Sequence, residues 1–325
     1  MRKLKRVLIL THPKHRPDRG ARRDGTEDHV WMALKRLGHV VKVVGVNGDL
    51  STLQHEIAEF EPDIIFNLME EFLNEAIFDF HVISYLEALE IPFTGCNPRG
   101  LILSRNKFLV GSFAVSLGIQ IPRTFLLGHG LPKLPKNLPP FPLFVKLNRE
   151  HASLGIRESN RVTNARQLHA TCARLKRDFD CEMLVQEFIS GADVFVSVWG
   201  NHKPEVLPPR TLPSKNRDRI STARLKFSPA YQVRHGVKSF PFKGKVSKQI
   251  CDQSLMLFRN LDLSGYARFD FRVTGDGEPF LIDVNANPNL SRTEDFARSL
   301  HSRGWTYLDV IQNIMNLGLS YRPNV

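Results

Sequence analysis

A stretch near the C-terminus, residues 266–289, has the residue types and the spacing of half of a divalent-metal site. Two runs that alternate between polar and apolar residues flank the pair Asp276-Gly277, which favours a β-hairpin with a two-residue turn. Side chains alternate between the two faces of a strand, so such a turn fixes which residues share a face. Four polar residues then lie together on one face of the predicted hairpin: Arg268, Asp270, Asp283 and Asn285.

The predicted pairing places two carboxylates directly opposite each other. Asp270 faces Asp283, and Arg268 faces Asn285. Opposed carboxylates repel, so we expect a cation between them, and an oxygen-donor set of this kind suits Mg²⁺. The other face of the hairpin carries apolar side chains and is expected to be core: Phe269, Phe271, Ile282 and Val284.

The length and composition are those of a soluble globular protein with more than one domain. The chain has 325 residues, of which 42% are hydrophobic and 24% are charged. A chain of this length has more residues than one hydrophobic core ordinarily organises, so two or three domains are expected. Apolar runs stay shorter than the roughly 20 residues that cross a bilayer, and the run after the basic start fits a buried strand better than a signal peptide.

The cysteines and the net charge narrow the functional class. The four cysteines are scattered without a CxxC spacing, so neither a zinc site nor a disulfide framework is expected, and a reducing cytoplasm is the default location. The net charge of +12 fits either nucleic-acid binding or a site for phosphate groups. The denser basic clusters, 12–23 and 215–226, lack interleaved aromatic residues, so nucleic acid is not expected as a partner.

The order of predicted elements indicates an α/β domain followed by two α+β units. Over about the first 95 residues, strands alternate with helices, which favours a mainly parallel sheet. The expected strands there are 5–10, 40–46, 64–66 and 91–94. One helix is expected to begin at residue 26, and another is expected to cover roughly 75–89. Later helices are expected near 105–117, 164–177, 246–260 and 306–317, with strands at 144–147, 183–188 and 193–199.

We therefore expect three domains. The first, residues 1–96, is the N-terminal α/β domain. The second, 97–195, is a small central lobe, and the third, 196–325, is a C-terminal lobe that carries the predicted metal site.

Several polar residues of the central lobe are individually ambiguous. Lys107 and Lys146 lie on separate elements, and each alone is typical of a solvated surface lysine. The loop 153–155 has small residues but lacks the Gly-Lys-Ser/Thr of a Walker A loop. Residues 186–189 end a strand, and Asp193 follows after a short turn. Their order along the chain is more informative than any one of them.

Taken in that order, these features resemble the ATP-grasp superfamily, specifically its D-alanine–D-alanine ligase-like branch. Residues 93–96, Phe-Thr-Gly-Cys, look like the family's Tyr-Thr-Gly-Ser segment. Residues 283–288, Asp-Val-Asn-Ala-Asn-Pro, are similar to its Glu-Val-Asn-Thr-x-Pro motif and, with 268–270 upstream, are the specific part. The resemblance covers most of the chain. It implies an ATP-grasp fold in the α/β class, in which an N-terminal parallel α/β domain precedes two α+β lobes that clasp ATP.

The resemblance implies roles around ATP. Lys107 and Lys146 would contact the phosphates as compact point charges. The backbone N–H groups of the loop at Ser153 and Gly155 would close over them. Asp193 would accept hydrogen bonds from the ribose hydroxyls. The adenine base would meet a hinge that comprises Gln186, Glu187, Phe188 and Ile189.

The same resemblance assigns the metal site and the catalytic residues. Two Mg²⁺ ions, with Mn²⁺ as an alternative, would be held by Asp270, Asp283 and Asn285. Arg268 would stabilise the charge that builds on the transferred phosphoryl group. Lys226 lies roughly where the family has a third basic residue near the γ-phosphate, and it joins Arg268 and Ser153 as a candidate catalytic residue.

The implied reaction is formation of an amide or peptide bond. Transfer of the γ-phosphoryl group to a carboxylate gives ADP and an acyl phosphate, and attack by an amine then releases phosphate. Positioning and cationic screening supply most of the catalysis, and water must be kept from the acyl phosphate. The expected partners are small-molecule carboxylate and amine substrates, and the resemblance is compatible with a homodimer.

The substrate ends of the motifs depart from the family pattern. Asp283 replaces a Glu, and Asn289 stands where the branch has a Gly whose N–H binds the oxyanion. The family's glycine-rich first loop is replaced by residues 12–19, with Glu27 as the candidate for its glutamate, and segment 66–71 lacks its His-Gly pair. We therefore expect substrates other than two D-alanines, and the basic first loop suggests a more anionic one.

Two other functions stay open at this level. One is an ATP-grasp scaffold that holds nucleotide without turnover, which the intact set of Arg268, Asp270, Asp283 and Asn285 argues against. The other is an ATP-dependent modifier of a protein or peptide terminus, which the basic surface favours.

Overall fold

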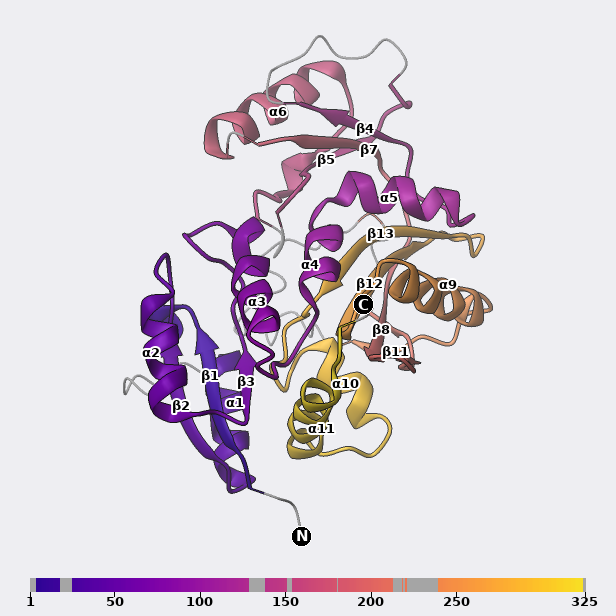
Figure 1. Ribbon diagram of the computed structural model, residues 1–325. Coiled ribbons are helices and arrows are strands. Elements are labelled where there is room, and N and C mark those ends of the chain that lie inside the picture. The colour runs from indigo at the N-terminus through magenta and orange to yellow at the C-terminus, as the bar shows by residue number, and fades with distance from the viewer. Residues whose placement is uncertain are drawn as a thin grey trace.

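The computed structural model describes residues 4–17, 25–128, 138–150, 154–179, 181–212, 218, 220 and 239–323. Within these ranges the strands form three separate sheets, and each sheet is covered by helices (Figure 1). No helix in the described ranges is long and apolar enough to cross a membrane.

The N-terminal sheet is parallel, with β1 (Arg6–Thr11) between β2 (Val40–Gly45) and β3 (Ile64–Asn67). Its strands are buried because helices cover both faces: α1 (Thr26–Arg36) and the C-terminal α11 (Tyr307–Ser320) on one, α2 (Ser51–Phe60) and α3 (Asp79–Ala88) on the other. The end of the chain therefore packs on its beginning. The strand expected at 91–94 is wrong, because only one bridge, Ile65 to Phe93, forms there.

The central sheet is antiparallel, in the order β4 (Thr124–Leu127), β7 (Met183–Glu187), β5 (Leu143–Leu147) and β6 (Arg161–Val162). Helix α6 (Ala165–Phe179) covers one face and buries Val145 and Leu147 of β5. Because side chains alternate, the intervening Lys146 points away from α6, toward the C-terminal sheet.

The C-terminal sheet has the order β11 (Phe240–Pro241), β10 (Arg210–Thr211), β8 (Ala192–Gly200), β12 (Gly265–Val273) and β13 (Pro279–Ala286), with β9 (Glu205–Val206) beside β8. Helices α9 (Ser247–Asn260) and α10 (Asp295–His301) pack on it, and α4 (Pro98–Arg105) and α5 (Lys107–Ser116) lie along β13. The domain boundaries stay predictions, and the one placed at 195–196 falls within β8.

The predicted pairing of the hairpin is confirmed at its polar face. Asp270 pairs with Asp283, and Arg268 pairs with Asn285. The two-residue turn is wrong: the tip is a three-residue loop, 275–277, closed by a hydrogen bond of 2.9 Å from Thr274 N–H to the Glu278 carbonyl. A bulge in β13 opposite the step from Asp270 to the next residue restores the predicted register.

The bulge also corrects the expected core. Phe269, Phe271 and Val284 are buried as predicted, whereas Ile282 is only half-buried. Leu281 takes its place in the core, 4% exposed, because the extra residue shifts the alternation of β13 by one position.

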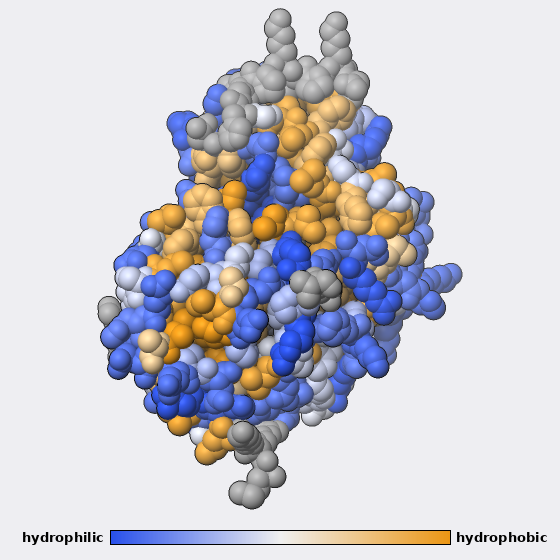
Figure 2. All heavy atoms as spheres, viewed as in Figure 1, coloured by the Kyte–Doolittle hydropathy of each residue, from blue (hydrophilic) through white to orange (hydrophobic). Residues whose placement is uncertain are grey.

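Hydrophilic side chains cover much of the face seen in Figure 2, and apolar ones gather near its middle, at the level of α4 and α5. The most exposed large apolar residues of these two helices are Ile102, Leu103, Leu109 and Val115.

Candidate functional site

Lys107, the first residue of α5, reaches the polar face of the hairpin. Asn106 begins the helix, because its side chain accepts a hydrogen bond of 3.1 Å from Leu109 N–H. The Lys107 side chain is 7% exposed, and its Nζ lies 3.5 Å from Asp283 Oδ1. Nζ also donates to the Glu150 carbonyl at 2.7 Å. Burial lowers the pKa of Lys107 because the ammonium loses water, while Asp283 opposes the shift.

Lys146 approaches the same strand from the central sheet. It is 5% exposed, and its Nζ donates to the Ile282 carbonyl at 2.9 Å. Ile282 is the residue that the bulge takes out of the regular ladder. The bulge thus supplies an acceptor for Lys146 and holds this second cation one residue from Asp283.

Arg268 and Asp270 form a bidentate pair on β12. Nε lies 2.6 Å from Oδ1, and Nη2 lies 2.9 Å from Oδ2. Asn285 Nδ2 is 3.4 Å from the same Oδ2. Burial alone lowers the pKa of Arg268, but the Asp270 carboxylate outweighs this effect and raises it above the usual arginine value. The guanidinium is therefore held charged and fixed in direction.

The predicted metal ligands fit Mg²⁺ in their chemistry. Asp270, Asp283 and Asn285 share one face of the hairpin, and all offer oxygen atoms, the donors that Mg²⁺ prefers. In the described part of the chain, no group of three or more His, Cys, Asp and Glu side chains forms a metal cluster. The candidate set is therefore two carboxylates and an amide, next to Arg268 and Lys107.

The predicted adenine hinge is tied down by neighbouring segments. Gln186 Nε2 donates to Thr124 Oγ1 at 2.8 Å. Glu187 N–H binds the Arg123 carbonyl at 2.9 Å, and Phe188 N–H binds the Pro142 carbonyl at 3.1 Å. Since these two N–H groups are used within the chain, the edge of a base would be met by other backbone groups of the hinge.

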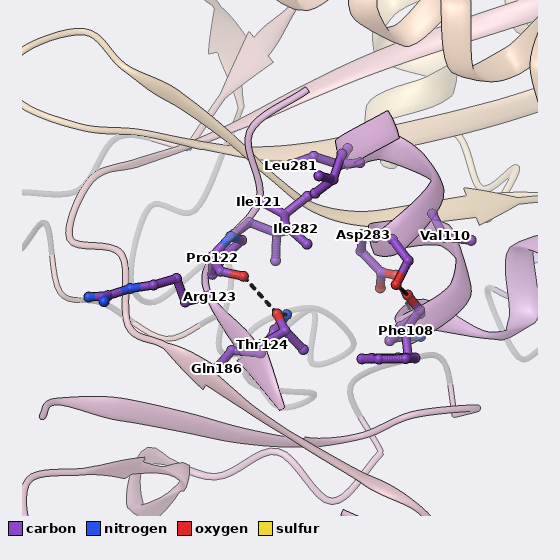
Figure 3. A pocket seen from close by; sticks show the side chains of 14 residues that line it. Phe108, Val110, Ile121, Pro122, Arg123, Thr124, Gln186, Leu281, Ile282 and Asp283 are labelled. Atoms are coloured by element: carbon purple, nitrogen blue, oxygen red, sulfur yellow. Dashed lines mark hydrogen bonds and ion pairs between the residues drawn. The ribbon is translucent and has the colours of Figure 1, made fainter. Parts of the chain in front are cut away.

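A pocket of about 470 Å³ lies between α5, the segment 121–124, β7 and β13 (Figure 3). Three of the predicted ATP-site residues, Lys107, Gln186 and Asp283, belong to its lining. In Figure 3, Ile282 and Asp283 enter from β13, and Thr124 and Gln186 enter from the central sheet opposite. The pocket therefore opens where the two sheets approach the ion pair of Lys107 and Asp283.

The phosphate loop is described only in part. Ser153 and Lys226 lie outside the described residues, and their roles stay predictions. Gly155 has φ +71°, and an added Cβ would lie 3.0 Å from side-chain atoms of Leu175 and Phe179. The left-handed backbone and the close packing on α6 therefore favour glycine at this position.

The last motif contacts the N-terminal domain. Asn289 Oδ1 accepts hydrogen bonds from Thr26 Oγ1 at 2.7 Å and from Ser291 N–H at 2.8 Å. Thr26 begins α1, and Glu27 follows it. The substrate end of the site thus joins α1 to segment 287–291.

Sequence reasoning missed two residues of this region. Arg272 of β12 forms an ion pair of 2.9 Å with Asp193, the predicted ribose ligand. Arg268, Asp270 and Arg272 follow one another at intervals of two residues, so strand alternation could have found Arg272. Asn287 accepts a hydrogen bond of 2.7 Å from Cys96 N–H, which joins the two motifs of the family resemblance. No local pattern indicates that contact.

The parallel N-terminal sheet, the two antiparallel sheets and the polar hairpin define an ATP-grasp fold, as predicted. The chain belongs to the D-alanine–D-alanine ligase family, since residues 134–316 match the family model described as D-ala D-ala ligase C-terminus. The predicted family and its class, ATP-dependent ligases, are therefore confirmed.

Individual relatives are distant. The chain is 28% identical to the uncharacterized protein y4sG of Sinorhizobium fredii, over 89% of this chain and 86% of that protein. It is 27% identical to a D-alanine–D-alanine ligase of Aquifex aeolicus, over 88% and 92% of the two chains. The crystal structure of a D-alanine–D-alanine ligase from Bacillus anthracis complexed with ATP aligns with a TM-score of 0.72 at 17% identity, over 97% of both chains.

Proposed function

We propose that this chain is an ATP-dependent ligase that joins a carboxylate to an amine through an acyl phosphate. One observation carries the proposal: two buried lysines from different elements, Lys107 and Lys146, meet the β13 hairpin at Asp283 and its neighbour. Arg268 and Asp270 lie on the paired strand. Cations and carboxylates in this arrangement suit a polyphosphate, and family membership supports ATP.

Each residue acts by binding or positioning. Lys107 and Lys146 hold the phosphates of ATP. Arg268, aligned by Asp270, stabilises the negative charge on the γ-phosphoryl group as it passes to the substrate carboxylate. A carboxylate oxygen gains the phosphoryl group while ADP leaves. The amine nitrogen then attacks the acyl carbon, the C–N bond forms and the C–O bond to the phosphate breaks. Phosphate leaves with the oxygen that it received, and the proton that the nitrogen loses ends on the released phosphate.

Asp270, Asp283 and Asn285 would hold Mg²⁺, whose charge, when bound, screens the phosphates. The oxygen-only donor set supports this assignment. ATP is supported further by the Bacillus anthracis relative, which was solved in complex with ATP.

We also propose that the substrates are not two D-alanines. Asn289 stands where the family has a glycine. Its side chain accepts hydrogen bonds from Thr26 and Ser291, which a glycine could not do. Sequence identities of 27% and 28% to the relatives leave room for changed substrates. We expect small-molecule partners and a cytoplasmic location, in line with four free cysteines, and a homodimer stays a prediction.

A screen for ADP release tests the proposal. The protein is incubated with Mg²⁺-ATP and pools of amino acids, dipeptides and small acids, and separately with a protein mixture. The ligase predicts release that needs both a carboxylate and an amine of low molecular mass. Release only with protein would indicate a terminus modifier, and ATP binding without any release would indicate a binding scaffold. Efficient synthesis of D-alanyl-D-alanine would contradict the proposed substrate change.

Two matched variants locate the chemistry. Asp270→Asn removes a carboxylate of the site, and the expected result is loss of metal-dependent turnover with an unchanged fold. Asp276→Asn, at the exposed tip of the same hairpin, makes the same chemical change away from the site and should leave turnover as in the wild type. Full turnover in Asp270→Asn would show that the hairpin face is not the active site.

A further inference from the structure

Arg272 is a buried arginine on the face of β12 that carries Arg268 and Asp270. It is 9% exposed and lies directly opposite Asp193 of β8 in the strand register. A buried guanidinium is costly unless its hydrogen bonds are satisfied, so its partners show what holds it in place.

One guanidinium makes three contacts at the predicted nucleotide end of the site. Nε lies 2.9 Å from Asp193 Oδ1, and Nη1 donates to the Gly191 carbonyl at 2.9 Å. The guanidinium carbon lies 5.6 Å from the centre of the Phe188 ring. Arg272 therefore connects the hinge, the turn after it and the carboxylate that follows.

The turn at Gly191, between the hinge and Asp193, has little conformational freedom. A Cβ on Gly191 would lie 2.3 Å from the Val273 carbonyl oxygen, so the turn is packed directly against β12. Thr211 Oγ1 donates to the Asp193 carbonyl at 2.8 Å and fixes the backbone of that residue. With the backbone held, the planar fork of Arg272 acts directly on the direction of the Asp193 carboxylate.

We propose that Arg272 is a positioning residue that aims the Asp193 carboxylate at the ribose hydroxyls and so sets the preference of the site for ribonucleotides. The proposal rests on ATP as the nucleotide of the proposed function. A carboxylate that is less well aimed loses hydrogen bonds only to nucleotides that carry the hydroxyls. Loss of Arg272 should therefore weaken ATP binding and spare a nucleotide without them.

A purely structural role predicts a different result. The ion pair also links β8 to β12, and loosening these strands would weaken both kinds of nucleotide equally. The ratio of two dissociation constants, for ATP and for 2′,3′-dideoxy-ATP, separates the two roles. Calorimetric titration with Mg²⁺ present gives both constants for the whole chain.

The wild type should prefer ATP by about 10- to 100-fold, since hydrogen bonds to a charged group contribute at this scale. Arg272→Met keeps the apolar stem beside Phe188 and should reduce the preference to about 3-fold or less. Arg272→Lys, which cannot make both polar contacts in one plane, should fall between. The single variant Asp193→Asn should also lower the preference for ATP. Adding Arg272→Met to Asp193→Asn should then change the ratio of the two dissociation constants little.

Arg303→Met is the matched control. Arg303 also binds a carboxylate and a backbone carbonyl, Glu205 at 3.1 Å and Val206 at 2.8 Å, but far along the surface at β9. It should keep the wild-type ratio. A wild-type ratio in Arg272→Met would overturn the role of Arg272, and Arg272→Lys decides the same point if the Met variant does not fold. Failure of the wild type to bind ATP would instead overturn the proposed function.

Discussion

Lys107 and Asp283 form an ion pair between α5 and β13, with 3.5 Å between Nζ and Oδ1. The two residues have different predicted ligands, the phosphates and the metal ions. On β12 the same arrangement recurs, since Arg268 holds Asp270 through two contacts. The chain thus places each predicted metal carboxylate beside a predicted phosphate cation, which keeps like charges from collecting in one place.

Lys107→Met should weaken ATP binding strongly. The substitution removes a buried ammonium and leaves the apolar stem, so the fold should be kept. A charged hydrogen bond contributes about 1.5–3 kcal/mol, which corresponds to roughly a 10- to 100-fold loss of affinity. Titration calorimetry measures it, with Lys248→Met on the exposed side of α9 as the control. Affinity within about twofold of the wild type would remove Lys107 from the phosphate site.

The lowered pKa of Lys107 predicts opposite effects of alkaline pH on binding and on stability. ATP affinity should fall as the ammonium deprotonates, at a pH below the usual lysine value of 10.5. The unfolded chain binds more protons at this position in that interval, so the contribution to the free energy of unfolding rises with pH. Calorimetry and urea denaturation follow the two quantities. Both dependences should disappear in Lys107→Met, and an alkaline fall in affinity that survives there has another origin.

Asp270→Asn should cost stability as well as turnover. The neutral amide leaves the Arg268 guanidinium without its charged partner, and both side chains are mostly buried. Breaking such a pair lowers the free energy of unfolding by about 3 kcal/mol. Denaturant unfolding monitored by circular dichroism gives the value. Asp276→Asn at the hairpin tip should change it by less than about 0.5 kcal/mol, and an equal loss in both variants would show that the pair is not formed.

Asn287 predicts a comparison of two substitutions. Its side chain accepts the Cys96 N–H, and its backbone has φ +50°. Asn287→Ala loses the hydrogen bond and strains the backbone, with a loss of about 2–4 kcal/mol in the free energy of unfolding. Asn287→Gly loses the same bond without strain and should be more stable than Asn287→Ala by about 1 kcal/mol. Equal stability of the two variants would contradict this role of the left-handed backbone.

The polar face of the hairpin was predictable because period-two alternation and a turn signal determine which side chains share a face. The bulge beside Ile282 was not, since no residue type there marks an inserted residue. Its consequence, an acceptor for Lys146, depends on a strand of another sheet. Likewise, Arg272 could have been read from alternation, but its contact with Asp193 required the pairing of β8 with β12.

The helix α4 was missed although its signal is local. Asn97 accepts a hydrogen bond of 2.8 Å from Gly100 N–H, and Pro98 occupies the first helical position, a pattern that begins helices. The meeting of Lys107 with Asp283 is different in kind. It depends on how α5 packs along β13, which side-chain periodicity leaves undetermined.

Transfer of oxygen from the substrate carboxylate to phosphate tests the central claim most directly. A donor acid found by the ADP screen is labelled with ¹⁸O in its carboxylate and turned over with ATP and the amine. An acyl-phosphate ligase transfers one labelled oxygen to phosphate in each turnover, and mass spectrometry of the released phosphate should show it. Unlabelled phosphate, or release of AMP and pyrophosphate, would contradict the mechanism assigned to this site.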